Sequence, residues 1–246
     1  IILGARPSYG KTSLVLDIAR QAATVSKKSV AIFSIEMSRE QIIDRHISGQ
    51  AQIPLWRLRT GRLNDEMEFS LVQQALDELS KSRIFIDDTA SPTLLQMRSM
   101  ARRLQIEHGI DLIIIDYLQL IQPRTSSDNI VQQVTEISRG LKALARELNV
   151  PVLAVSQLSR DVEKREVKIP RLSDLRESGS LEQDADVVLL IYRKDRDRLD
   201  TPESDKNITE IIIAKHRNGP VGSIKLMFDP EKVGFKNLDN RHSIEQ

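Results

Sequence analysis

The residues best suited to chemistry are Gly10-Lys11-Thr12, which close a short loop that begins at Gly4. The apolar residues Ile1-Ile2-Leu3 precede this loop, and a helical pattern from Thr12 to Val25 follows it. A loop between strand and helix that ends in Gly-Lys-Thr is typical of a P-loop (Walker A). Its backbone N–H groups and the positive end of the following helix bind phosphate. The sequence therefore predicts a nucleoside triphosphate site here.

One position departs from the strict P-loop pattern, which has Gly where this chain has Ala5, with Gly4 one place early. Alanine is a small change from glycine. Lys11 is expected to reach the β- and γ-phosphates, and the Thr12 hydroxyl to hold Mg²⁺. The residues expected to bind ATP at this loop are Ala5, Ser8, Gly10, Lys11, Thr12 and Ser13.

A second candidate is Asp116, which ends the apolar run from Leu112 to Ile115. A carboxylate at the carboxyl end of a buried strand is the Walker B arrangement, in which it helps to hold Mg²⁺ at the phosphates. The alternative is an aspartate that simply starts a turn. With a P-loop upstream, we expect Thr12 and Asp116 to share the metal.

Two further polar residues follow predicted strands. Glu36 could activate the attacking water in an ATPase, but an acid there could also favour the N-terminal dipole of a helix. Gln157 could hydrogen-bond a γ-phosphate or its water, and the alternative is an ordinary polar loop residue. Position alone leaves both readings open.

Lys215, His216 and Arg217 lie near the tip of a hairpin predicted from Asn218-Gly219. Turn tips are often basic for solubility. The functional alternative is an arginine finger offered to the nucleotide of a neighbouring subunit, where guanidinium stabilises the charge that spreads over the transferring phosphoryl group.

The stretch from Arg176 through Glu177 to Gly179 and Ser180 is predicted as a short loop whose N–H groups and arginine could meet a phosphodiester. Solvated charged loops are the alternative. Aromatic residues make up only 4% of the chain, so a stacking platform for single strands is not expected. If nucleic acid binds, we expect its phosphates to carry the interaction.

Composition sets broad limits. The 246 residues suffice for one large domain, 40% are apolar and 29% charged, and the net charge of +1 gives no overall field for nucleic acid. The absence of cysteine excludes disulfides and thiolate chemistry. No apolar run reaches the length of a membrane span, so no membrane association is expected. The chain opens at Ile1 within an expected strand, which suggests a fragment, and cytoplasm is the default expectation.

Short apolar runs alternate with helical patterns, which predicts an α/β fold: a mostly parallel, twisted sheet with helices on both faces and a C-terminal β-hairpin. We expect a single domain over residues 1–246. Irregular segments are expected at 53–60, 159–171 and 193–206, and a loose tail after Phe235. The expected strands are 29–35, 83–87, 111–116, 151–156, 187–192, 208–215 and 221–228, and the expected helices are 12–25, 38–49, 65–79, 93–108 and 130–148.

Taken together, the motifs resemble the C-terminal, RecA-type ATPase domain of replicative DNA helicases of the DnaB family. The resemblance covers almost the whole chain, and its combination of motifs is far more specific than any one of them. Tyr9 stands where the family more often has Met. The matching segments are Gly4–Thr12, Phe33–Ser38, Ile114–Leu120, Val155–Arg160, Asp174–Ser180, Gln183–Asp186 and Ala214–Gly219.

The resemblance implies specific roles. Glu36 corresponds to the catalytic glutamate and Asp116 to the Walker B acid, while Gln157 corresponds to the glutamine coupled to the γ-phosphate. Lys215 and Arg217 correspond to a pair delivered in trans to a neighbour's nucleotide. The residues expected to face single-stranded DNA in the central channel are Arg176, Glu177 and Gly179.

The family is hexameric and moves 5′→3′ on DNA, and its full-length proteins contact primase and a helicase loader. The resemblance thus predicts an ATP- and Mg²⁺-dependent ring translocase whose N-terminal domain and linker lie outside this chain. Whether the bacterial, phage or organellar branch is represented stays open. A filament-forming RecA-type recombination ATPase and a nucleotide-gated loader are the alternatives that the sequence leaves.

Overall fold

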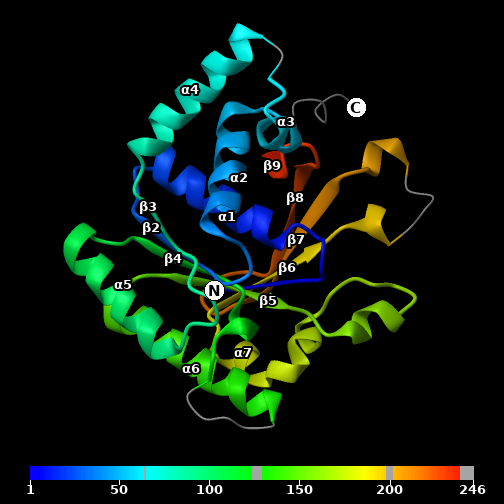
Figure 1. Ribbon diagram of the computed structural model, residues 1–246. Coiled ribbons are helices and arrows are strands. Elements are labelled where there is room, and N and C mark those ends of the chain that lie inside the picture. The colour runs from blue at the N-terminus through cyan, green and yellow to red at the C-terminus, as the bar shows by residue number, and fades with distance from the viewer. Residues whose placement is uncertain (64, 124–128, 198–201, 239–246) are drawn as a thin grey trace.

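The structure is a computed structural model that describes residues 1–63, 65–123, 129–197 and 202–238, except for the side chains of 176–179. The described residues form a nine-stranded sheet in the order β3-β2-β4-β5-β1-β6-β7-β8-β9 (Figure 1). The parallel strands are β1 (Ile2–Ala5), β2 (Val30–Ser34), β3 (Ile84–Asp87), β4 (Leu112–Asp116), β5 (Val152–Gln157) and β6 (Val187–Tyr192). The antiparallel strands are β7 (Ile208–His216), β8 (Gly222–Asp229) and β9 (Gly234–Asn237).

Helices cover both faces of this sheet, as Figure 1 shows, with α1, α2 and α4 on one side and α5, α6 and α7 on the other. The 3₁₀ segments are η1 (Leu118–Leu120), η2 (Arg160–Lys164), η3 (Leu172–Ser178), η4 (Lys194–Arg196) and η5 (Glu203–Asp205). The α-helices are α1 (Lys11–Thr24), α2 (Arg39–Ala51), α3 (Leu55–Thr60), α4 (Glu66–Ser80), α5 (Leu94–His108), α6 (Ile130–Leu148) and α7 (Gly179–Asp184). The predicted fold class is confirmed.

Local sequence explains where the main helices begin. Ser38 caps α2 and Thr93 caps α5, each in a capping box with a glutamine three residues later. Asp65 caps α4 by accepting a hydrogen bond from the Glu68 N–H. These caps satisfy N–H groups that a helix start would otherwise leave unpaired. The starts of these helices therefore agree with the sequence expectation.

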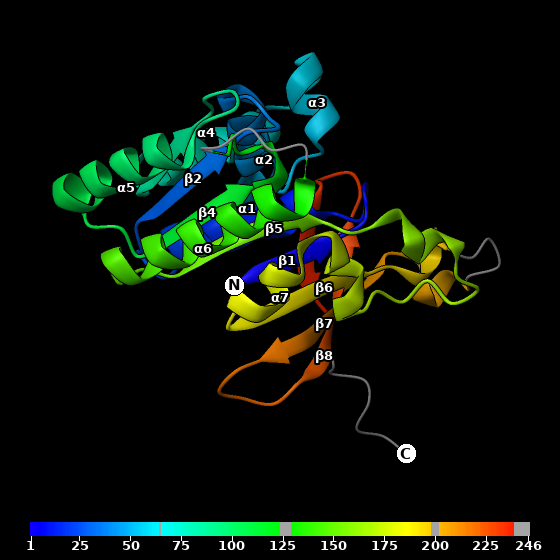
Figure 2. The ribbon, with the colours of Figure 1, turned by 90° about the horizontal axis from the view of Figure 1, so that it is seen from below.

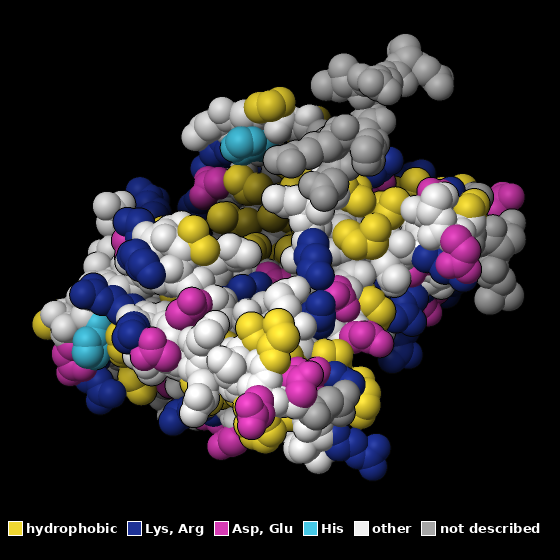
Figure 3. Space-filling view, turned by 90° about the horizontal axis from the view of Figure 1, so that it is seen from above, with side chains coloured by type: hydrophobic (Ala, Val, Ile, Leu, Met, Phe, Trp, Pro, Cys, Tyr) yellow, Lys and Arg dark blue, Asp and Glu magenta, His cyan; other side chains and the backbone are white. Residues whose placement is uncertain are grey.

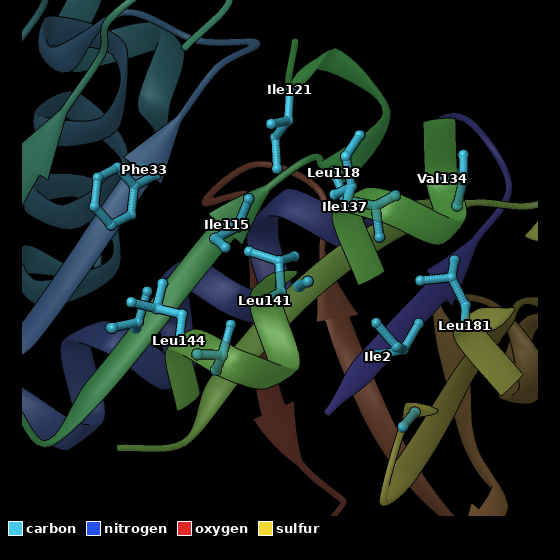
Figure 4. Close-up of a cluster of buried hydrophobic side chains, with 14 of the residues drawn as sticks. Ile2, Phe33, Ile115, Leu118, Ile121, Val134, Ile137, Leu141, Leu144 and Leu181 are labelled. Carbon is cyan, nitrogen blue, oxygen red and sulfur yellow. The ribbon is translucent and has the colours of Figure 1, made fainter. Parts of the chain in front are cut away.

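Each face of the sheet has its own apolar core. One core lies between the sheet and helices α5, α6 and α7, and Figure 4 shows Ile137, Leu141 and Leu144 of α6 directed at strand residues such as Ile115. The other core packs α1 and α2 on the opposite face. Central strands covered on both faces need apolar side chains throughout, which is why β1, β2 and β4 read as continuous apolar runs.

Three local predictions were wrong. Residues 55–60 form α3 rather than an irregular connection, and the tail after Phe235 begins inside β9. Residues 172–184, part of which was predicted as a loop, form the 3₁₀ segment η3 followed directly by α7. The predicted C-terminal hairpin is confirmed: β7 and β8 pair antiparallel, and residues 217–221 connect them. Short helices and added edge strands depend on tertiary contacts, which local pattern does not record.

Acidic and basic side chains intermingle across the face shown in Figure 3, in keeping with the net charge of +1. Among the described residues, no helix is both long and apolar enough to cross a bilayer.

His46 on α2 is buried, with a side chain only 4% exposed, and its Nε2 has no hydrogen-bond partner within the described chain. Burial, reinforced by the positive charge of Arg20, lowers the pKa of His46 to about 4. The unfolded chain therefore binds a proton that the folded chain rejects between pH 6.5 and pH 4. As far as His46 is concerned, the free energy of unfolding is highest above this window and falls as the pH falls through it.

We expect His46→Gln to remove this part of the pH dependence, because glutamine does not titrate. The free energy of unfolding of the parent protein should fall by up to about 3 kcal/mol more than that of the variant between pH 6.5 and pH 4. Urea titrations at several pH values measure this slope. His216→Gln, at an exposed position, is the matched control; equal slopes in the parent and the His46 variant would contradict the assignment.

Candidate functional site

The P-loop lies where β1 meets α1. Gly10 is the N-cap of α1 and has a φ of 91°, a left-handed conformation that suits glycine. A Cβ at this position would lie 3.0 Å from the Phe235 ring, so β9 also leaves little room for a side chain there. The first turn of α1 thus opens with N–H groups that no side chain of the described residues caps. This is the arrangement that binds anions at a helix N-terminus.

Four predicted residues meet at the end of this helix. Lys11 Nζ lies 2.5 Å from Glu36 Oε2 and 3.4 Å from Asp116 Oδ1, while the Thr12 hydroxyl donates a hydrogen bond to Asp116 Oδ2 at 2.5 Å. Lys11 also lies over the Tyr117 ring, 4.5 Å from its centroid. The structure therefore brings Lys11, Thr12, Glu36 and Asp116 into one cluster.

Strand topology explains this cluster. Ser34 pairs with Asp116 at the ends of β2 and β4, and Ala5 pairs with Gln157 at the ends of β1 and β5. The carboxyl ends of these parallel strands share one edge of the sheet, which is where ligands bind in open α/β folds. Asp116 is buried there, and burial raises the pKa of its carboxyl, although Lys11 and Thr12 oppose the shift.

Gln157 lies at the same edge with an exposed side chain. Its backbone is held by the Gln119 side chain, which donates to the Gln157 carbonyl at 3.2 Å and to the Ser156 hydroxyl at 3.0 Å. The backbone of Gln157 is thus fixed beside the P-loop, while its side chain faces solvent.

A cavity of about 400 Å³ opens over the P-loop. Three arginines that sequence reasoning missed line it: Arg45, Arg59 and Arg196. Arg45 Nη1 donates to the Ser13 hydroxyl at 3.3 Å, and its buried Nε has no partner within the described residues. Burial, followed by the charge of Arg59, lowers the pKa of Arg45. The spacing of Gln41 and Arg45 places both on one face of α2, but only the structure shows that this face lines the cavity.

The Tyr9 side chain links the P-loop to the segment after β6. Its hydroxyl donates to Asp197 Oδ1 at 2.6 Å, and Arg6 Nη1 lies 2.6 Å from the same oxygen. Burial and the contact with Asp197 raise the pKa of the Tyr9 hydroxyl above its usual value. The segment after β6, which carries Arg196, is thereby tied to the P-loop.

Lys215 and Arg217 lie at the opposite edge of the sheet. The Arg217 N–H bonds to the Asp186 carbonyl at 2.8 Å, just before β6, whereas Gly4 of β1 pairs with Leu190 near the end of β6. Four residues of strand separate these levels, about 13 Å along the sheet. Figure 2 shows the β7–β8 connection at the end of the sheet away from where β1 ends. The predicted finger therefore does not join its own chain's cluster.

The predicted DNA-facing residues Arg176, Glu177 and Gly179 have side chains outside the described residues. Their backbone runs through the end of η3 and the start of α7. Their placement relative to DNA stays a prediction.

Comparison of this chain with known proteins agrees with this architecture. The family model for the DnaB-like helicase C-terminal domain matches residues 1–237. The chain is 51% identical over 242 residues to the replicative DNA helicase DnaB of Geobacillus stearothermophilus, covering 98% of this chain and 53% of that protein. It is 46% identical over 240 residues to the Haemophilus influenzae DnaB, covering 97% and 51%. The chain thus spans about half the length of these curated relatives.

Two solved structures share the fold. One, described as an ATPase domain, superposes with a TM-score of 0.92 at 41% identity, covering 97% of this chain and 84% of that one. A DnaB-like replicative helicase, described with its interactions with primase, superposes with a TM-score of 0.91 at 41% identity, covering 97% and 57%.

We expect Lys11→Ala to weaken binding of a fluorescent ATP analogue by roughly 30-fold or more. A charge-assisted contact of this kind contributes about 2 kcal/mol, and its loss also leaves Glu36 and Asp116 without their shared cation. Fluorescence titration measures the affinity, and circular dichroism checks the fold. Lys28→Ala, which removes an exposed pair with Asp111, is the matched control. Unchanged affinity in the Lys11 variant would contradict the assignment.

Proposed function

Because this chain belongs to the DnaB-like helicase C-terminal domain family, we propose that it is the ATP-driven motor of a replicative DNA helicase. In this proposal a ring of six copies hydrolyses ATP at its subunit interfaces and moves 5′→3′ along single-stranded DNA. The observation that carries the interface claim is the separation of Arg217 from the Lys11 cluster of the same chain. Because Arg217 and the phosphate cradle lie at opposite ends of the strands, each copy of the chain could complete the site of its neighbour.

The residues at the cradle fit an ATP–Mg²⁺ complex. The cavity of about 400 Å³ lies over the uncapped start of α1, and Thr12 and Asp116 present oxygens of the kind that Mg²⁺ prefers, already within 2.5 Å of each other. Mg²⁺ at Thr12 and Asp116 would neutralise charge on the phosphates. Ala5, Ser8, Gly10 and Ser13 would complete the cradle, and we add Arg45 as a further cation beside it.

In the proposed reaction, Glu36 orients and deprotonates the attacking water. Its side chain is 46% exposed and faces Lys11, so the carboxylate lies at the cradle and is open to solvent. When Lys11 turns to the phosphates, Glu36 is released to accept the proton. Gln157 contacts the γ-phosphate or its water, and Arg217 of the next subunit, with Lys215, stabilises the transferring phosphoryl group.

DNA is proposed to contact Arg176, Glu177 and Gly179 in the ring channel, mainly through its phosphates. Relatives named as replicative DNA helicases support this substrate. Primase and a loader are proposed partners of the full-length protein, and a relative's structure is described with primase. We propose that the full-length protein acts in the bacterial cytoplasm, at the replisome. No observation in the structure favours the filament-forming recombinase or the nucleotide-gated loader.

We expect Arg217→Ala in the full-length protein to lower kcat for ATP hydrolysis on the order of 10³-fold, because trans-acting arginines stabilise charge that develops only in the transition state. The affinity for ATP should change little, since the chain's own cradle is intact. A steady-state ATPase assay with single-stranded DNA, beside nucleotide titration, separates the two quantities. Lys225→Ala, which removes a cation from β8 of the same hairpin, is the control. Normal hydrolysis by the Arg217 variant would contradict the proposed finger.

A further inference from the structure

The carboxylate of Asp186 holds two cations at the end of the sheet opposite the P-loop. Its Oδ2 accepts a hydrogen bond from Lys142 Nζ of α6, and its Oδ1 lies 3.1 Å from Arg217 Nη1. Asp186 and Arg217 are also joined through their backbones, by the Arg217 N–H to the Asp186 carbonyl. The side chain of Arg217 thus contacts a residue that lies beside it, where β7 has ended and β6 is about to begin.

This arrangement leaves the positive charge of Arg217 uncancelled. Lys142 compensates the single negative charge of Asp186, and its hydrogen bond is the main reason why the pKa of Asp186 is lowered. The carboxylate therefore stays ionised at neutral pH. With one carboxylate between two cations, the group as a whole keeps a positive charge with which to attract phosphate.

Among the residues that the structure describes, the guanidinium of Arg217 is anchored on one side only. Its contact with Asp186 uses Nη1, while the side chain remains 56% exposed. Arginine has five N–H donors in a rigid fork, so one edge can hold a carboxylate while others meet a second anion. An arginine fixed in this way loses less conformational entropy when it binds phosphate than a free one does.

The segment from Glu182 to Asp186, which carries the carboxylate that contacts Arg217, is itself bonded to helix α6. Ser138, one helical turn before Lys142 on α6, donates to Asp184 Oδ2 at 2.7 Å. Lys215 Nζ donates to the carbonyl of Glu182 at 2.6 Å, which satisfies an acceptor at the end of α7. Helix α6, packed on the sheet, thus holds both cations of the hairpin in place through the short segment from Glu182 to Asp186.

We propose that Asp186, neutralised by Lys142, is a positioning residue for Arg217: it orients the guanidinium toward the nucleotide of the neighbouring subunit. This inference rests on the proposed trans-acting role of Arg217 and adds how that residue is aimed. The alternative is that Asp186 holds Arg217 in an inactive position. The two readings predict opposite effects on kcat when the carboxylate is removed.

The test is a double-mutant cycle in the full-length protein. We expect Asp186→Ala to lower kcat roughly tenfold, the size typical of a supporting residue behind an active group. The KM for ATP and the affinity for a fluorescent ATP analogue should not change. In the Arg217→Ala background, Asp186→Ala should have no further effect, because its action passes through the arginine.

Glu147→Ala is the matched control, since it also removes a carboxylate with two cationic partners, Arg98 and Arg102, but Glu147, on α6, does not bond Arg217. It should keep kcat within about twofold of the parent. If Asp186→Ala does not fold, Lys142→Met takes its place: the unbalanced carboxylate then cancels the charge of Arg217, and kcat falls only while Arg217 is present.

The inference is overturned if Asp186→Ala raises kcat or leaves it unchanged. It is also overturned if Asp186→Ala lowers kcat as much in the Arg217→Ala background as in the parent, or if Glu147→Ala lowers kcat as much as Asp186→Ala does. Normal hydrolysis by Arg217→Ala alone would instead remove the proposed function on which the inference rests. If Arg217→Ala lowers kcat for ATP hydrolysis while Asp186→Ala leaves it at the parent value, only the positioning inference is wrong.

Discussion

The reversal of chain direction between β6 and β7 is the constraint on which the rest of this structure depends. Because β6 runs parallel to β1 and β7 runs antiparallel to β6, a chain that places its phosphate cradle at one edge of the sheet must place Lys215 and Arg217 at the other. An arginine side chain cannot span that distance. Any role for Arg217 in phosphoryl transfer therefore requires a second copy of the chain, so that fold and assembly are linked by geometry.

The buried Lys11 illustrates how the resting site is stabilised. A charge removed from water is costly unless it is paired, and here Glu36 and Asp116 together supply the compensation. The phosphates of a nucleotide carry the same sign as these carboxylates, so they can replace Glu36 as the partner of Lys11. In the proposed reaction, such an exchange would leave Glu36, which faces solvent, available for the attacking water. At the far edge, Asp186 holds Arg217 without cancelling its charge, because Lys142 stands on its other side.

Much of this arrangement could be predicted from sequence, because buried parallel strands leave continuous apolar runs, and strand ends such as Asp116 and Glu36 then fall at one edge. Arg45 could not be found in this way, since nothing local distinguishes an arginine that faces a cavity from one that faces water. The short helix α3 and strand β9 were missed because their partners are distant in sequence: the Leu55 N–H bonds to the Glu231 carbonyl, and the Phe235 N–H bonds to Asp17. The contact between Asp186 and Arg217 could not be predicted either, because it depends on the register in which β6 and β7 pair.

The most direct test mixes two inactive subunits of the full-length protein. One carries Lys11→Ala and keeps Arg217, and the other carries Arg217→Ala and keeps the cradle. If neighbouring copies share each site, mixed rings contain interfaces with an intact cradle and an intact arginine, and ATP hydrolysis reappears well above that of either variant alone. If mixed rings, verified by native mass spectrometry, hydrolyse no faster than the separate variants, the shared-site account is wrong.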